Sequence, residues 1–328
     1  MAKVIRIVFF ICSLAVLHAC SDENPTEPPK SNDPFADCGN DEPISSNDSA
    51  WSMFPWARYR ISELRISSYN GYWAGTYERH NFASTDLTYA SGVFLYDPHR
   101  NVPITGFTDS WGHSWSPDGK TLLFTNSNTI YTYNQLNGKL TQLTEPEASD
   151  IAYWSVDGKH IYYRHYGTYV MNPDGSEKRP VTDMIWRAKV LDASRLVAVY
   201  KDTLRIFNIP DSTLTKIYKP EMDPSHHLNA YDISPDSKFI IFQTQQNGGV
   251  LDPWGNGVWL MHTKTWTAKK IRGAQWWGHE YYPTWASDNT FYASVFCRKD
   301  SSSMIWEFDL NGNPIRQITT KEMRVWLN

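Results

Sequence analysis

The sequence has few of the features that mark a catalytic or nucleic-acid-binding chain. Its 328 residues include four cysteines, no CxxC pair, no HExxH stretch and no glycine-rich phosphate loop. Lys and Arg number 31 against 35 Asp and Glu, which gives a formal net charge of -4, and no dense basic run occurs. Nucleic acid is therefore not an expected partner. The one long apolar run, VFFICSLAV at 8–16, is too short to cross a bilayer.

The N-terminus has the pattern of a secretory signal. Lys3 and Arg6 precede the apolar run, and the stretch LHAC at 17–20 follows it. That stretch resembles a bacterial lipobox, which implies that residues 1–19 are removed and that Cys20 becomes the lipidated first residue. Several acyl chains would hold the protein at a membrane through the N-terminal lipid only. A simple cleaved signal or a short membrane anchor is the alternative.

Residues 20–60 are rich in Pro, Asn, Asp and Ser, and they cannot bury a core, so we interpret them as a flexible tether. The acidic start Ser21-Asp22-Glu23 resembles an export signal of surface lipoproteins. We therefore expect an outer membrane lipoprotein on the periplasmic face or the cell surface. Cys38 and Cys297 would lie in an oxidising compartment, and the sequence leaves open whether they form a disulfide or remain two free thiols.

A short motif recurs through the rest of the chain. WSPDGK at 115–120 is followed 39 residues later by WSVDGK at 154–159, and ISPDSK stands at 233–238. Degenerate copies lie at 191–195 and 285–289, and the stretch ISSYNG at 66–71 fits as the first. Each copy precedes an apolar strand such as TLLFT or FIIFQ.

A second element repeats in phase with the first: an aromatic strand, a turn and a polar strand, in six copies. Units of about 40 residues with four short strands are typical of a β-propeller. The sequence thus predicts an all-β, six-bladed propeller of four-stranded antiparallel blades. The tail MRVWLN would pair with the first blade and close the ring, and seven blades are the alternative if residues 48–66 add strands. The expected blades are about 61–108, 109–145, 146–184, 185–219, 220–273 and 274–320.

The motif has a physical reason. Pro117 sets φ at the second turn position, Asp118 can accept hydrogen bonds from nearby amides, and Gly119 accepts a positive φ. The Trp or Ile before the turn would pack between neighbouring blades. The pattern resembles the TolB-type propeller repeat W-S-P-D-G-K-x-I-x-F. The resemblance covers residues 61–328, and it implies a fold rather than an activity.

Two apparent functional motifs are better explained as ordinary parts of the blades. The stretch GHSWS at 112–116 lacks the last glycine of a G-x-S-x-G nucleophile elbow, and a strand follows it instead of a helix. Ser114 is therefore predicted to be an ordinary strand residue. The stretch DLNGN at 309–313 resembles the start of a calcium loop, but it lies in a blade hairpin.

Histidine, tryptophan and arginine are predicted to gather on one face. In a propeller, one face carries the hairpins between strands one and two and between strands three and four. The other carries the two–three loops, where we place His80 and His165, and the blade connections, where we place His113, His227 and His279. An aromatic, Arg-rich surface of loops favours a glycan or an extended peptide. The predicted ligand-binding residues are His80, Trp111, His113, Arg164, His165, Trp186, Arg187, His227, Trp254, Trp276, Trp277 and His279.

Two functions follow from this distribution. The favoured one is a non-catalytic binding module for an envelope protein or glycan, without a cofactor. In the alternative, His113, His227 and His279 converge on the axis and bind a divalent metal such as manganese or calcium. That arrangement is similar to the oligogalacturonate lyases, and it implies a metal-dependent polysaccharide lyase or hydrolase. Individually, the histidines are more often strand caps, and Trp115, Trp154 and Trp285 are predicted to be structural.

Overall fold

The computed structural model describes residues 59–81, 88–146, 151–182, 188–209, 211, 213–220, 226–246, 257–273, 282–297 and 302–319. The predicted signal, most of the tether, Cys20, Cys38 and the C-terminal tail lie outside these ranges. Within them the chain forms strands and turns, and no helix long and apolar enough to cross a membrane is found there.

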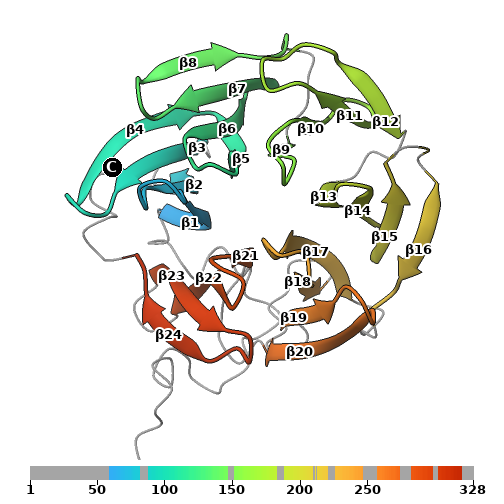
Figure 1. The fold of residues 1–328 in the computed structure, drawn as a ribbon. Coiled ribbons are helices and arrows are strands. Elements are labelled where there is room, and N and C mark those ends of the chain that lie inside the picture. Colours follow the sequence, from blue (N-terminus) through green and yellow to red (C-terminus); the bar gives the residue numbers. More distant parts are fainter. Residues whose placement is uncertain are drawn as a thin grey trace, which may run out of the picture.

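The described strands form six separate four-stranded sheets, arranged as a ring (Figure 1). Blade 1 contains β1 (Tyr59–Ile66), β2 (Trp73–Asn81), β3 (Thr88–Asp97) and β4 (Val102–Thr108). Blade 2 contains β5 (Ser110–Trp115), β6 (Thr121–Asn126), β7 (Thr129–Asn134) and β8 (Lys139–Gln142). Blade 3 contains β9 (Ala152–Trp154), β10 (Ile161–Arg164), β11 (Thr168–Met171) and β12 (Arg179–Thr182).

The second half of the ring repeats this order. Blade 4 contains β13 (Lys189–Asp192), β14 (Arg195–Tyr200), β15 (Thr203–Asn208) and β16 (Leu214–Tyr218). Blade 5 contains β17 (His226–Ile233), β18 (Phe239–Gln246), β19 (Gly257–His262) and β20 (Thr267–Gly273). Blade 6 contains β21 (Thr284–Trp285), β22 (Thr290–Cys297), β23 (Ser302–Asp309) and β24 (Pro314–Gln317).

The six-bladed prediction is confirmed. All pairings within the blades are antiparallel, and residues 59–66 form the first strand of blade 1 rather than part of a seventh blade. Each described blade uses four consecutive strands, so no strand in these ranges is exchanged between the first and last blades. A hydrogen bond joins those two blades instead, since the Thr284 hydroxyl donates to the Leu64 backbone carbonyl at 2.9 Å. The strand pairing predicted for the tail falls outside the described residues.

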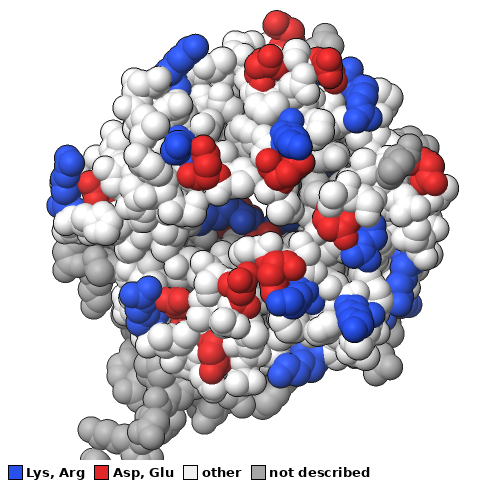
Figure 2. Space-filling view, in the orientation of Figure 1, with Lys and Arg blue, Asp and Glu red and all other residues white. Residues whose placement is uncertain are grey.

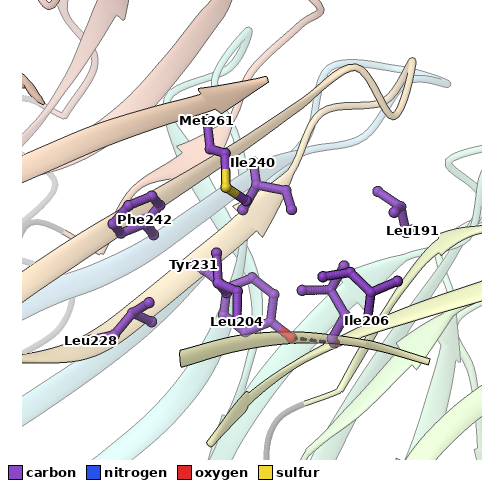
Figure 3. Packing of buried hydrophobic residues seen from close by; sticks show 9 residues of the cluster. Leu191, Leu204, Ile206, Leu228, Tyr231, Ile240, Phe242 and Met261 are labelled. Carbon is purple, nitrogen blue, oxygen red and sulfur yellow. Dashed lines mark hydrogen bonds between the residues drawn. The ribbon is translucent and has the colours of Figure 1, made fainter. Parts of the chain in front are cut away.

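Apolar side chains on both faces of the blades fill the spaces between neighbours. Between blades 4 and 5, Leu191 and Ile206 pack with Ile240, Phe242 and Met261, all of them almost completely buried (Figure 3). Burial of each such side chain contributes about 1.5–3 kcal/mol. Because both faces are covered, the inner strands carry continuous apolar runs instead of strict alternation.

The recurring motif forms one hydrogen-bonded turn. The Ser116 hydroxyl donates to the Asp118 carboxylate at 2.6 Å, and the amides of Lys120 and Thr121 donate to Asp118 and Ser116. The hydrogen bond from Ser116 is the main cause that lowers the pKa of Asp118. The turns at 155–160 and 234–239 repeat this network, with serine–aspartate distances of 2.7 Å in both. The predicted turn chemistry is confirmed.

Two of the motif tryptophans join neighbouring blades. The Trp115 indole N–H donates to the Arg65 carbonyl in blade 1, and the Trp285 indole N–H donates to the Asp232 carbonyl in blade 5, both at 3.2 Å. In each case the acceptor is the residue two positions before the turn serine of the preceding blade. Trp154 packs against the core between blades 2 and 3. The structural role predicted for these tryptophans is confirmed.

Candidate functional site

The ring has two different faces. The turn face, as we call it, carries the turns that join first to second and third to fourth strands, such as 116–120 and 135–138. The loop face carries the segments between second and third strands and the connections between blades. Of the predicted site residues, six fall outside the described ranges, and so does the side chain of His80 in β2. These six are Trp186, Arg187, Trp254, Trp276, Trp277 and His279.

The described part of the loop face presents an exposed aromatic turn in blade 3. His165 follows directly on Arg164 at the end of β10, so its predicted place in a two–three loop is confirmed. The ring of His165 packs edge-on against Tyr166 and Tyr169, with centroids 4.9 and 5.3 Å apart. Tyr166 is 84% exposed and has a φ of 58°. A bulky aromatic residue rarely adopts that backbone conformation, which marks the position as strained.

The predicted positions of His113 and His227 in blade connections are wrong. Both lie within innermost strands, β5 and β17, because those strands begin earlier than the motif spacing implies. Pairing of β5 with β6 shifts between Trp111 and Ser114, and this irregularity accommodates the additional strand residues. Trp111 is correspondingly a half-buried strand residue.

His113 is a core histidine. Its ring is fully buried, and Nδ1 lies 3.1 Å from the Thr76 hydroxyl of blade 1. Burial lowers the pKa of His113 to about 4; the charges of Arg65 and Lys189 act in the same direction, whereas the Glu63 carboxylate opposes them. No group of three or more His, Cys, Asp or Glu side chains suited to a metal occurs in the described ranges, and His279 lies outside them.

Charged residues that sequence reasoning missed meet near the ring axis. Both terminal nitrogens of Arg65 in β1 donate to the Asp232 carboxylate in β17, at 3.2 Å each. Lys189 in β13 donates to the same carboxylate at 2.9 Å and to the Tyr231 carbonyl at 2.8 Å. The backbone N–H of Trp285 also donates to the Asp232 carboxylate, at 3.0 Å. We call Arg65, Lys189 and Asp232 the axial clasp, which links blades 1, 4 and 5, with blade 6 joined through Trp285.

The axial clasp is a buried, paired charge cluster. Side-chain exposure is 19% for Arg65, 11% for Lys189 and 7% for Asp232. Burial alone would raise the pKa of the Asp232 carboxyl, but the charges of Arg65 and Lys189 outweigh burial and hold it well below its usual range. Burial lowers the pKa of Lys189 against the attraction of Asp232. The clasp thus joins blades far apart in the chain, and its acceptors are occupied within the protein.

Glu63 lies beside the clasp without taking part in it. It stands two residues before Arg65 on β1 and is partly exposed, and it forms no hydrogen bond or ion pair with another described residue. The Nε of Arg65 is buried and has no hydrogen-bond partner among the described residues either. In the space-filling view, acidic and basic side chains surround a central opening, and basic side chains lie within it (Figure 2). Charged residues inside otherwise apolar inner strands, as in SELRI and AYDIS, are the signal that would have revealed this site.

No protein-family model matches the chain, and no curated protein sequence matches it. Among solved structures, a putative TolB from Agrobacterium tumefaciens is 14% identical with a TM-score of 0.53, covering 70% of this chain and 87% of that one. The β-propeller domain of Cps50 (Swd1) from Myceliophteria thermophila is 13% identical, with a TM-score of 0.49 and coverage of 80% and 87%. An oligogalacturonate lyase in complex with manganese is 9% identical, with a TM-score of 0.49 and coverage of 78% and 84%. At these identities the likeness to the TolB protein shows the fold alone.

Proposed function

We propose that this chain is a lipid-anchored cell-envelope propeller that binds a protein or glycan partner through its loop face, without catalysis. The observation that carries the proposal is the difference between the two faces. Short hydrogen-bonded turns form the turn face, whereas the longest stretches of sequence between consecutive strands, 247–256 and 274–283, connect strand ends that lie on the loop face. Binding residues concentrate on loops that a rigid scaffold positions.

The scaffold supports this role because it is held together across blade boundaries. The axial clasp and the indole hydrogen bonds of Trp115 and Trp285 each cross between blades. Because the ring is restrained in this way, its loop residues lose little conformational entropy when a partner binds. Tyr166, exposed and strained on the loop face, is the described side chain best placed to contact a partner.

The proposed envelope location rests on the N-terminal sequence. With Cys20 lipidated, the tether at 21–58 would have a root-mean-square length of roughly 35 Å. The strand β1 runs toward the turn at 67–71, so the chain enters the ring on the loop face. An anchored propeller would therefore have its tether attached on the face that we propose binds the partner.

The test compares matched variants on the two faces. Tyr166→Ala removes an exposed side chain from the loop face, and Leu136→Ala removes one that is 56% exposed on the turn face. Retention of purified envelope polysaccharide and of detergent-solubilised envelope proteins on the immobilised full chain should fall at least tenfold for Tyr166→Ala only. Equal retention by the two variants would contradict a loop-face site. Cleavage of uronate polymers on addition of manganese would instead support the alternative, a metal-dependent lyase.

A further inference from the structure

Two polar groups of β1 at the axis remain available after the clasp has formed. The four hydrogen bonds to Asp232 use both terminal nitrogens of Arg65, the ammonium of Lys189 and the amide of Trp285. The Glu63 carboxylate and the Arg65 Nε have no hydrogen-bond partner in the described part of the chain. A buried donor without a partner costs about 1–3 kcal/mol, so a ligand that supplies an acceptor there gains affinity.

The spacing of these two groups sets the size of a ligand. Glu63 pairs with Thr76 and Arg65 pairs with Ala74 across the same two strands, so both side chains leave β1 on the same side. Two residues along a strand span roughly 6.6 Å. A single six-membered ring with its hydroxyl groups matches this spacing of the two strand positions.

The charge balance of the site excludes simple ions. Arg65 and Lys189 carry two positive charges, and Glu63 and Asp232 carry two negative charges, so the four groups sum to zero. A cation beside Glu63 would also lie in the field of Arg65 and Lys189, which both interact electrostatically with Glu63. An anion beside the Arg65 Nε would meet the field of Glu63 and Asp232. Transfer of an ion from water to such a site is unfavourable without a net opposite charge.

We propose that the axial opening binds a neutral polyhydroxylated ring, that is, one sugar residue, between Glu63 and Arg65. A hydroxyl group donates to a carboxylate and accepts from a guanidinium N–H, so one sugar satisfies both free groups without adding charge. Tyr153 is partly buried beside the clasp, and the Lys189 nitrogen lies over its ring, 4.8 Å from the centroid.

This inference deepens the proposed function, on which it rests, because it names the glycan as the partner and places one of its residues at the axis. The test measures binding of the full chain to methyl glucoside, methyl galactoside, glucuronate and glucosamine by saturation-transfer NMR and calorimetry. At least one of the two neutral sugars should bind at least tenfold more tightly than both glucuronate and glucosamine. Glu63→Gln should weaken neutral binding at least tenfold and should make glucuronate bind more tightly than glucosamine.

Asp288→Asn is the matched control, because it changes an exposed carboxylate to an amide on the turn face of blade 6. It should leave all four affinities unchanged. Glu63 accepts no hydrogen bond within the clasp, so Glu63→Gln should remain folded, which its thermal unfolding curve checks. Absence of neutral-sugar binding to the folded parent, or equal binding by the parent and Glu63→Gln, would overturn the inference.

The two proposals fail in different ways. If Tyr166→Ala loses retention of polysaccharide while Glu63→Gln binds neutral sugars as the parent does, the loop-face function stands and the axial site is refuted. If Glu63→Gln loses monosaccharide binding while Tyr166→Ala retains polysaccharide fully, the axial site stands and the loop-face function is refuted.

Discussion

Acidification from about pH 7.5 to about pH 5 should lower the free energy of unfolding by about 2 kcal/mol through His113 alone. The ring of this histidine is fully buried beside Thr76, and its pKa in the folded protein is about 4, against an ordinary value of 6.5. Between these two pH values the unfolded chain binds a proton that the folded chain does not. Acid therefore favours unfolding throughout that window.

The magnitude follows from the two pKa values. One pKa unit corresponds to about 1.36 kcal/mol, so the complete window from 6.5 to 4 is worth about 3 kcal/mol. The contribution of His113 is fully present above pH 6.5 and is lost as the pH falls toward about 4. At about pH 5 the unfolded chain is almost fully protonated at this site and the folded chain is not, which accounts for about 2 kcal/mol of the loss.

Urea titrations of the parent and of His113→Gln at the two pH values measure this effect. The variant cannot take up the proton, so its loss of stability between the two pH values should be smaller than that of the parent by about 2 kcal/mol. Any cost of the substitution at neutral pH cancels in this difference. His99→Gln, at an exposed position in the turn after β3, controls for removal of a histidine outside the core. The reasoning is refuted if parent and His113→Gln lose equal stability.

Three further changes test the packing of the ring and the anchor. Asp232→Asn leaves Arg65 and Lys189 uncompensated and should lower the free energy of unfolding by about 3–5 kcal/mol. The control Asp236→Asn, four residues later in the turn, should lower it by only about 1 kcal/mol. Similar urea midpoints for the two variants would contradict the buried role of the clasp. Gly119→Ala and Gly138→Ala share a φ of 69°, but the added Cβ lies 2.5 Å from a backbone nitrogen of blade 1 only at Gly119. Gly119→Ala should therefore lower the thermal midpoint by several degrees more than Gly138→Ala, and equal midpoints would show that blades 1 and 2 adjust freely. Cys20→Ala should release the protein from the membrane fraction, and retention there on fractionation would exclude the lipid anchor.

The repeat made the architecture predictable because its determinants are local. The hydrogen bonds that form each turn, such as those among Ser116, Asp118 and Thr121, join residues no more than five positions apart. Composition and spacing within one short stretch therefore specify the turn, and six phased copies specify six blades. The tryptophans were predictable for the same reason, since a large side chain before a tight turn has space only against the next blade.

The position of His113 was not predictable in this way. Whether a residue before the motif belongs to a connection or to the strand depends on where pairing with the next strand begins. In blade 2 the irregular pairing between Trp111 and Ser114 extends the inner strand past the point that spacing suggests. The loop-face assignment therefore failed for His113 and held for His165, which follows a regular hairpin strand.

The sequence by itself determined the all-β class, the number and order of blades and the chemistry of their turns, because contacts within about 40 residues produce them. Only the tertiary structure decided the axial clasp, since Arg65 and Lys189 reach Asp232 across 167 and 43 positions of the chain. Each of these residues looks alone like an ordinary charged residue in a short strand. Closure of the ring brings the inner strands together around one axis, and burial at that axis makes their charges pair, while Glu63 has no hydrogen-bond partner among the described residues.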